Sequence, residues 1–261
     1  MLPSSSSGGL PVDRRQSSMS PLRPSTPSTS SGLQSEFLQR MFTPAQISWD
    51  YASSQMVLCT LQPSKVYKMN QWRKQTKNQW ARDDPGFLLI LLALTFVSSL
   101  AYAVAFHAYA PVYGFIKVAL HGAFQVLGVG AAIASLGWYV ANSYLRVRSG
   151  HTVEQKVEWL YCFDIHCNGF ISLFALLHVA QFFALPLLLR DGFAAAIAAN
   201  LLYGVAGGAY VYVTFIGYTS MPFLKNTQLF IYPGYALILL LVSLTLFDYN
   251  AAKLTMRFYF G

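Results

Sequence analysis

The side chains best suited to chemistry lie in one stretch, VEWLYCFDIHCNGFISLFALLHVAQFF, residues 157–183. Its candidate functional residues are Glu158, Cys162, Asp164, His166, Asn168, His178 and Gln181. On a continuous helix Glu158, Cys162 and His166 share one face, because they recur at every fourth position. A carboxylate, a thiol and an imidazole on one face could bind zinc or act as acid and base. The stretch has no H-E-x-x-H, H-x-x-E-H or paired C-x-x-C motif, so we assign no catalytic, cofactor or metal residue and expect no cofactor.

The composition indicates a membrane protein. Hydrophobic residues make up 54% of the chain and charged residues 11%, with a mean hydropathy of +0.40. A soluble domain usually carries about 25% charged residues. Ten of the eighteen Lys and Arg lie before residue 86, so the net charge of +8 is concentrated in the first third of the chain. This distribution favours an anionic surface beside a membrane over a basic protein as a whole.

Long apolar runs predict an all-α fold, a polytopic membrane helical bundle with about five transmembrane helices. The first run has no Lys, Arg, Asp or Glu over 23 residues. A helix of that length crosses a hydrocarbon core of about 30 Å with some tilt. The predicted spans are 87–109, 114–140, 169–189, 193–218 and 229–247.

The polar side chains inside the third span have a structural explanation. Placing His or Gln in contact with lipid inside a membrane costs free energy, so these side chains face the interior of a helix bundle. We therefore expect His178 and Gln181 to form hydrogen bonds between helices. A groove for a lipid or a partner, and a metal or catalytic site, are the alternatives.

The fold class also includes cytoplasmic N-terminal amphipathic helices. One of them is predicted over about 64–80, where the spacing of a basic stretch that contains Trp and precedes the first span indicates a moderately amphipathic helix. Basic residues predominate on this side of the spans, so the positive-inside rule places the N-terminus in the cytoplasm and, after five crossings, the C-terminus in the lumen. We predict a cytoplasmic docking face for a partner or for lipid, helped by the loop 141–168 and by Lys225 and Asn226. The residues of this face are Trp72, Arg73, Lys74, Lys77, Trp80 and Arg82.

The same basic and aromatic side chains could bind RNA, because Trp stacks on bases and Lys and Arg neutralise phosphates. No RRM, KH or zinc-knuckle signature accompanies them. RNA binding is therefore kept as an alternative.

Four regions follow from these patterns. We predict a disordered Ser/Pro-rich tail, a cytoplasmic basic and aromatic helical region, a five-span bundle, and a short lumenal tail. Their bounds are 1–34, 35–85, 86–247 and 248–261.

Three stretches resemble the uncoordinated-50 family of Golgi and endoplasmic-reticulum membrane proteins. They read WRKQTKNQWARDDP (72–85), VEWLYCFDIHCNGF (157–170) and YVTFIGYTSMPFLKNTQLFIYP (212–233), and they stand in the family's order. The resemblance extends over about residues 40–247. Trp72 stands where the family pattern has Tyr, and Asn78 where it has Asp. The neutral Asn78 leaves the basic stretch more positive.

The resemblance implies a non-enzymatic factor of vesicle-mediated protein transport in the Golgi or endoplasmic-reticulum membrane. Its implied partners are membrane lipids, the exchange factors that activate Arf GTPases, and membrane-receptor cargo that it helps to assemble or traffic. RNA binding and an inner nuclear membrane location are also implied, from an animal member. An intramembrane enzyme or lipid-handling protein that uses Asp164, His166 and His178 is the competing hypothesis.

Overall fold

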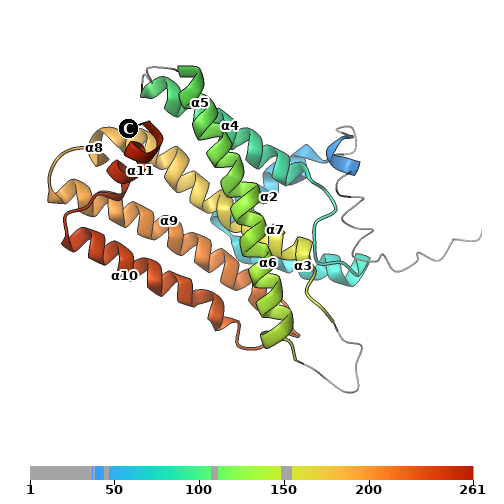
Figure 1. The fold of residues 1–261 in the computed structure, drawn as a ribbon. Coiled ribbons are helices and arrows are strands. Elements are labelled where there is room, and N and C mark those ends of the chain that lie inside the picture. Colours follow the sequence, from blue (N-terminus) through green and yellow to red (C-terminus); the bar gives the residue numbers. More distant parts are fainter. Residues whose placement is uncertain (1–36, 38, 44–46, 107–110, 148–154, 261) are drawn as a thin grey trace, which may run out of the picture.

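The chain folds into a bundle of helices (Figure 1). The computed structural model describes residues 37, 39–43, 47–106, 111–147 and 155–260, so the predicted tail 1–34 lies outside the described residues. Every regular element in the described part is helical, and a single isolated antiparallel bridge joins Arg146 and Leu224. The all-α prediction is confirmed.

Within the described residues, five helical segments are long and apolar enough to cross a membrane, as predicted. The first is α4 (Gly86–Ala105), and the second joins α5 (Pro111–Phe124) to α6 (Gly130–Val140) through a π-helical segment (Gln125–Val129) and ends in another (Ala141–Leu145). The third comprises α7 (Trp159–Phe174), a π-helical segment (Ala175–Ala180) and α8 (Gln181–Leu188), and the fourth is α9 (Phe193–Thr219). The fifth begins with a 3-10 turn (Thr227–Ile231) and continues as α10 (Tyr232–Leu246).

The third span corrects one prediction. The segment 141–168 is not a loop, because the second span continues to Leu145 and α7 begins at Trp159. Hydropathy starts the third span too late, at residue 169 in place of Trp159, because the first turns of α7 carry polar side chains. Every residue from Leu160 to Ser172 is nonetheless buried, because α2, α4, α6 and α9 pack around α7. Helix α7 is the centre of the bundle (Figure 1).

Two helices cover one end of the bundle, α2 (Trp49–Leu61) and α3 (Pro63–Lys77). The predicted helix over 64–80 ends earlier than expected, because Asn78 adopts a left-handed conformation with φ 55° and terminates α3. Such a residue is a common helix stop. We call the end that holds α2, α3 and residues 78–85 the basic end, and the other the α11 end. The basic end is the one predicted to face the cytoplasm.

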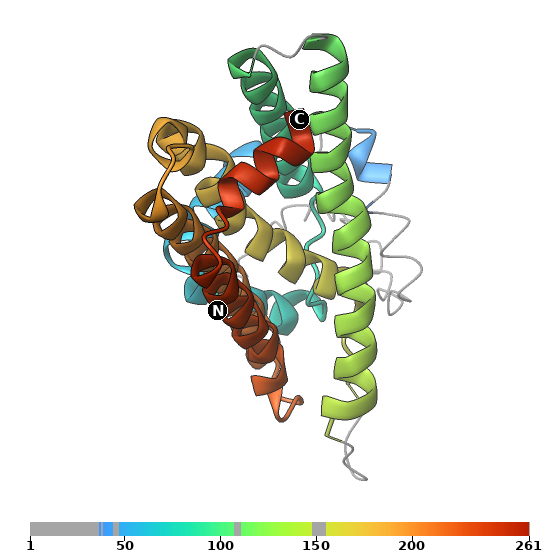
Figure 2. The same ribbon diagram turned by 60° about the vertical axis from the view of Figure 1, so that its left-hand side comes forward.

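The α11 end is closed by a helix where a short tail was predicted. Residues 251–260 form α11 (Ala251–Phe260), which crosses from the α8 and α9 side toward α5 (Figure 2). Asn250 starts it, since its Oδ1 accepts the Lys253 N–H at 3.0 Å and its Nδ2 donates to the Leu188 carbonyl at 2.7 Å. The helix folds back because it buries Ala252 and Met256 against the spans.

Candidate functional site

After α3 the chain turns back into the bundle. Trp80, Ala81 and Arg82 are only 3%, 0% and 4% exposed. The prediction that Trp80 and Arg82 belong to an exposed docking face is therefore wrong. The local sequence, which is basic and contains Trp, predicts exposed side chains. Trp80 and Arg82 are nevertheless buried, because residues far along the chain pack against them.

Arg82 is the centre of a buried polar network. Its backbone N–H donates to Asp164 Oδ2 at 2.7 Å, and its Nε lies 3.4 Å from Asp164 Oδ1. One guanidinium nitrogen donates to Asn168 Oδ1 at 2.6 Å and the other to Gln55 Oε1 at 3.2 Å. The guanidinium carbon lies 3.9 Å from the centre of the Phe87 ring. The side chain thus joins α2, the start of α4 and α7.

The charge of Arg82 is retained in this network. Burial by itself disfavours the charged form, but the Asp164 carboxylate beside it raises the pKa of Arg82 above its ordinary value. A buried ion pair repays its desolvation only when further hydrogen bonds satisfy both partners. The amide oxygens of Gln55 and Asn168 provide such bonds.

Glu158 holds the preceding residues in the same way. Its carboxylate accepts the backbone N–H of Trp80 at 3.2 and 3.3 Å and that of Ala81 at 3.1 Å. Glu158 is also the residue that precedes the first turn of α7. Two acids of the candidate cluster, Glu158 and Asp164, therefore hold the segment 78–85 in place.

The third stretch completes this arrangement. The Tyr161 hydroxyl donates to the Gly217 carbonyl at 3.2 Å and lies 3.0 Å from Ser220 Oγ. The Trp80 ring packs on Tyr161 and on Phe223, with centroid distances of 5.8 and 6.2 Å. The three stretches 72–85, 157–170 and 212–233 therefore meet at the basic end. We call this contact the junction, formed by Trp80, Arg82, Glu158, Tyr161, Asp164 and Gly217.

The two histidines of the candidate cluster form hydrogen bonds away from Asp164. His166 Nδ1 lies 2.8 Å from the Tyr210 hydroxyl of α9, and His178 Nδ1 lies 3.2 Å from Ser98 Oγ of α4. Both histidines therefore bond to a neighbouring helix, as expected for His178, whereas Gln181 Oε1 has no hydrogen-bond partner. Among the described residues, no three His, Cys, Asp or Glu side chains are placed to hold a metal ion. The geometry gives no support to an acid–base site made of Asp164, His166 and His178.

The chain is similar to known proteins over most of its length. Residues 37–260 match the UNC-50 family, the uncoordinated-50 family of the resemblance above. The chain belongs to the UNC-50 family. It is 43% identical over 228 residues to the protein unc-50 homolog of Dictyostelium discoideum, which covers 87% of each chain.

The human homolog is 40% identical over 210 residues, 78% of each chain. The Caenorhabditis elegans protein unc-50 is 39% identical over 231 residues, 86% of this chain and 73% of that one. No solved structure matches the chain. In this UNC-50 family member the matched region includes all five spans and α11.

The exposed part of the predicted docking face surrounds a recess of about 370 Å³. Trp72 is 68% exposed and the Lys77 side chain 61% exposed, whereas Arg73 and Lys74 are half-buried. Arg73 Nη2 donates to the Tyr51 hydroxyl at 2.9 Å, and Lys77 Nζ lies 2.5 Å from Asp83 Oδ2. We call this surface the basic recess; its charged and aromatic lining residues are Arg40, Tyr51, Trp72, Arg73, Lys77, Arg82, Asp83 and Asp84, of which Arg82 is buried in its wall.

Cys59 offers a chemical probe of the basic end. Its thiol is 1% exposed and lies 3.4 Å from Asn168 Oδ1, and burial raises its pKa from 9.0 to about 12. At pH 8 roughly one thiol in ten thousand is then ionised, and the thiolate is the species that reacts.

We therefore expect Cys59 to resist alkylation by a maleimide at pH 8 in the folded protein and to react rapidly after denaturation, as measured by mass spectrometry of its peptide. Rapid labelling of Cys59 in protein whose thermal transition is intact would show that α2 does not pack against α7 as described.

Proposed function

We propose that the chain is a non-enzymatic, multi-pass membrane factor of the Golgi and endoplasmic reticulum. It supports vesicle-mediated protein transport and the assembly or trafficking of cell-surface receptors. The basic recess faces the cytoplasm and docks Arf exchange factors. One observation carries the proposal: within the family stretch 72–85, Trp80 and Arg82 are buried, while Trp72 and Lys77 remain exposed around a recess.

The recess suits a protein partner better than a bare anionic membrane. Asp83 and Asp84 line it beside Arg73 and Lys77, and carboxylates repel lipid phosphates. Trp, Tyr and Arg contribute most of the binding energy at protein interfaces, and Trp72, Tyr51 and Arg73 all line the recess. The junction fixes the geometry, since Asp83 directly follows the buried Arg82.

Two variants test the recess in cells. Trp72→Ala removes the aromatic side chain without changing charge, and Arg73→Glu combined with Lys77→Glu reverses two charges. Lys74 is left intact because its Nζ donates to the Asn78 carbonyl at 2.9 Å and supports the end of α3. We expect proximity labelling of Arf exchange factors to fall by about tenfold or more in both, because hot-spot losses are about 2 kcal/mol.

The matched control is Lys65→Glu combined with Lys68→Glu, which makes the same charge change on exposed residues of α3 outside the recess. Labelling and receptor delivery should be retained in this control. If the recess charge variant and the control lost the same amount of labelling, the basic stretch would act only through a general attraction to anionic lipid. Unchanged labelling in the recess variants, at normal abundance and location, would remove the recess from the proposal.

A further inference from the structure

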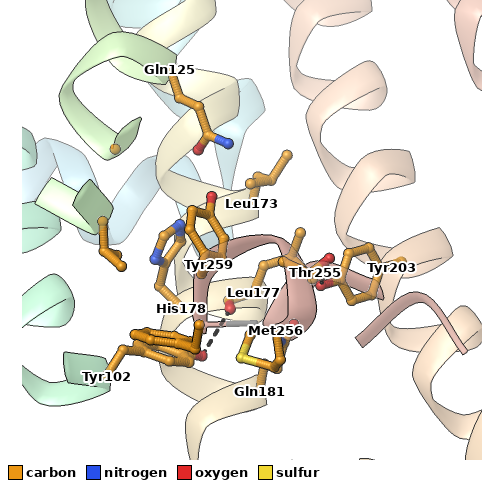
Figure 3. Close-up of a pocket in the computed structure, with 13 residues that line it drawn as sticks. Tyr102, Gln125, Leu173, Leu177, His178, Gln181, Tyr203, Thr255, Met256 and Tyr259 are labelled. Atoms are coloured by element: carbon orange, nitrogen blue, oxygen red, sulfur yellow. Dashed lines mark hydrogen bonds between the residues drawn. The ribbon is translucent and has the colours of Figure 1, made fainter. Parts of the chain in front are cut away.

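A second cavity lies inside the bundle at the α11 end, apart from the basic recess (Figure 3). It has a volume of about 170 Å³, is partly open, and is enclosed by α4, α5, the third span, α9 and α11. Apolar side chains such as Val118, Leu177 and Met256 form most of its wall. Its polar lining residues are Tyr102, Gln125, His178, Gln181, Tyr203 and Thr255.

Most of these polar groups already have partners. The Tyr102 hydroxyl donates to the Leu177 carbonyl at 3.3 Å, the dashed line in Figure 3. The Tyr203 hydroxyl donates to Thr255 Oγ1 at 2.8 Å. Gln181 is different: the side chain is 1% exposed, lines the cavity, and its Oε1 has no hydrogen-bond partner.

A buried amide oxygen without a donor is unfavourable, and a ligand with a donor group would satisfy it. None of the described residues that line the cavity is Lys, Arg, Asp or Glu, so a charged ligand would meet no counter-charge from them. The lining therefore selects a neutral molecule with one hydroxyl donor and an apolar body.

The volume of the cavity and its position in the bundle limit the possible ligands further. An apolar cavity of about 150 Å³ holds a single six-membered ring. A cavity of about 170 Å³ thus takes a ring-sized end of a larger molecule. The cavity lies between membrane-spanning segments, where lipids are the most abundant small molecules.

We propose that this cavity binds the hydroxyl end of a neutral membrane lipid, with the hydroxyl donating to Gln181 Oε1. Sterols and diacylglycerols share this chemistry. Helix α11 forms one wall of the cavity, through Thr255 and Met256. It is held by the stacked rings of Phe106 and Phe260, whose centroids are 4.8 Å apart, and by the Lys253–Asp191 ion pair at 2.6 Å.

The experiment uses the full chain in lipid nanodiscs, with a photoactivatable sterol and a photoactivatable diacylglycerol as probes. Gln181→Leu removes the acceptor at nearly constant volume, and Val118→Phe fills the cavity from α5. Gln75→Leu, at an exposed position of α3, is the matched control. We expect crosslinking of at least one probe to fall about tenfold in the first two variants and to be unchanged in the third. Crosslinked peptides should come from α5, the third span or α11.

Labelling by only one probe supports the proposal and identifies the lipid class. Equal labelling of wild type and Val118→Phe, or no labelling above a charged-lipid probe, overturns it. If Gln181→Leu fails to fold, the proposal is tested by comparing the crosslinking of Val118→Phe with that of wild type. A further readout separates ligand binding from structure: the unlabelled lipid should raise the thermal midpoint of wild type and of Gln75→Leu, but not that of Val118→Phe.

Discussion

Replacing Arg82 with Met lowers the free energy of unfolding by about 3–5 kcal/mol, because the Asp164 carboxylate is left buried without its counter-charge. The double variant Arg82→Met, Asp164→Asn recovers part of this loss, since the uncompensated charge is gone. The measurement is thermal unfolding of the purified protein in detergent, together with its abundance in cells.

The control for Arg82 is Lys77→Met, which removes the exposed partner of the Lys77–Asp83 pair in the same segment of the chain. A solvent-exposed ion pair contributes at most about 1 kcal/mol, so we expect little change. If Arg82→Met and Lys77→Met shifted the thermal midpoint equally, the ion pair of the junction would not be buried as described.

Replacing Gly217 with Ala is expected to destabilise the protein by about 1–3 kcal/mol, because the added methyl group overpacks the junction. A Cβ at this position would lie 2.9 Å from the Tyr67 hydroxyl and 2.9 Å from Ile165 Cγ1. Tyr67 and Ile165 are both 1% exposed, so neither side chain has free space to move into.

Helix α9 contains its own control for Gly217. A Cβ at Gly208 would meet nothing within 4 Å. Gly208→Ala should therefore raise stability by up to about 1 kcal/mol through helix propensity alone. Thermal midpoints of the two variants should move in opposite directions. A stabilising Gly217→Ala would mean that α3 and α9 are farther apart than described.

The two predictions bear on function through the basic recess. Arg82 and Gly217 do not form its exposed rim, but they hold the segment 78–85 and α3 against the bundle. A destabilised junction should therefore reduce partner labelling together with protein abundance. Recess variants such as Trp72→Ala should reduce labelling alone.

The amino-acid sequence by itself determines the membrane-spanning architecture. Long apolar runs around residues 87–109 and 193–218 specify spanning helices locally, since the backbone in a bilayer must satisfy its own hydrogen bonds. The three family stretches are also recognisable without a structure. Neither property depends on which distant residues come into contact.

Only the tertiary structure decides which polar residues are buried. The local sequence predicts that Arg82 is exposed, but in the structure it is buried because it pairs with Asp164, 82 positions later. The same pairing places Asp164 inside α7, where hydropathy alone had predicted a loop. The Gln181 cavity likewise depends on α11 folding back over the spans. A charge or an amide is buried where distant residues supply its counter-charge or hydrogen bonds. The local sequence pattern does not show which residues those are.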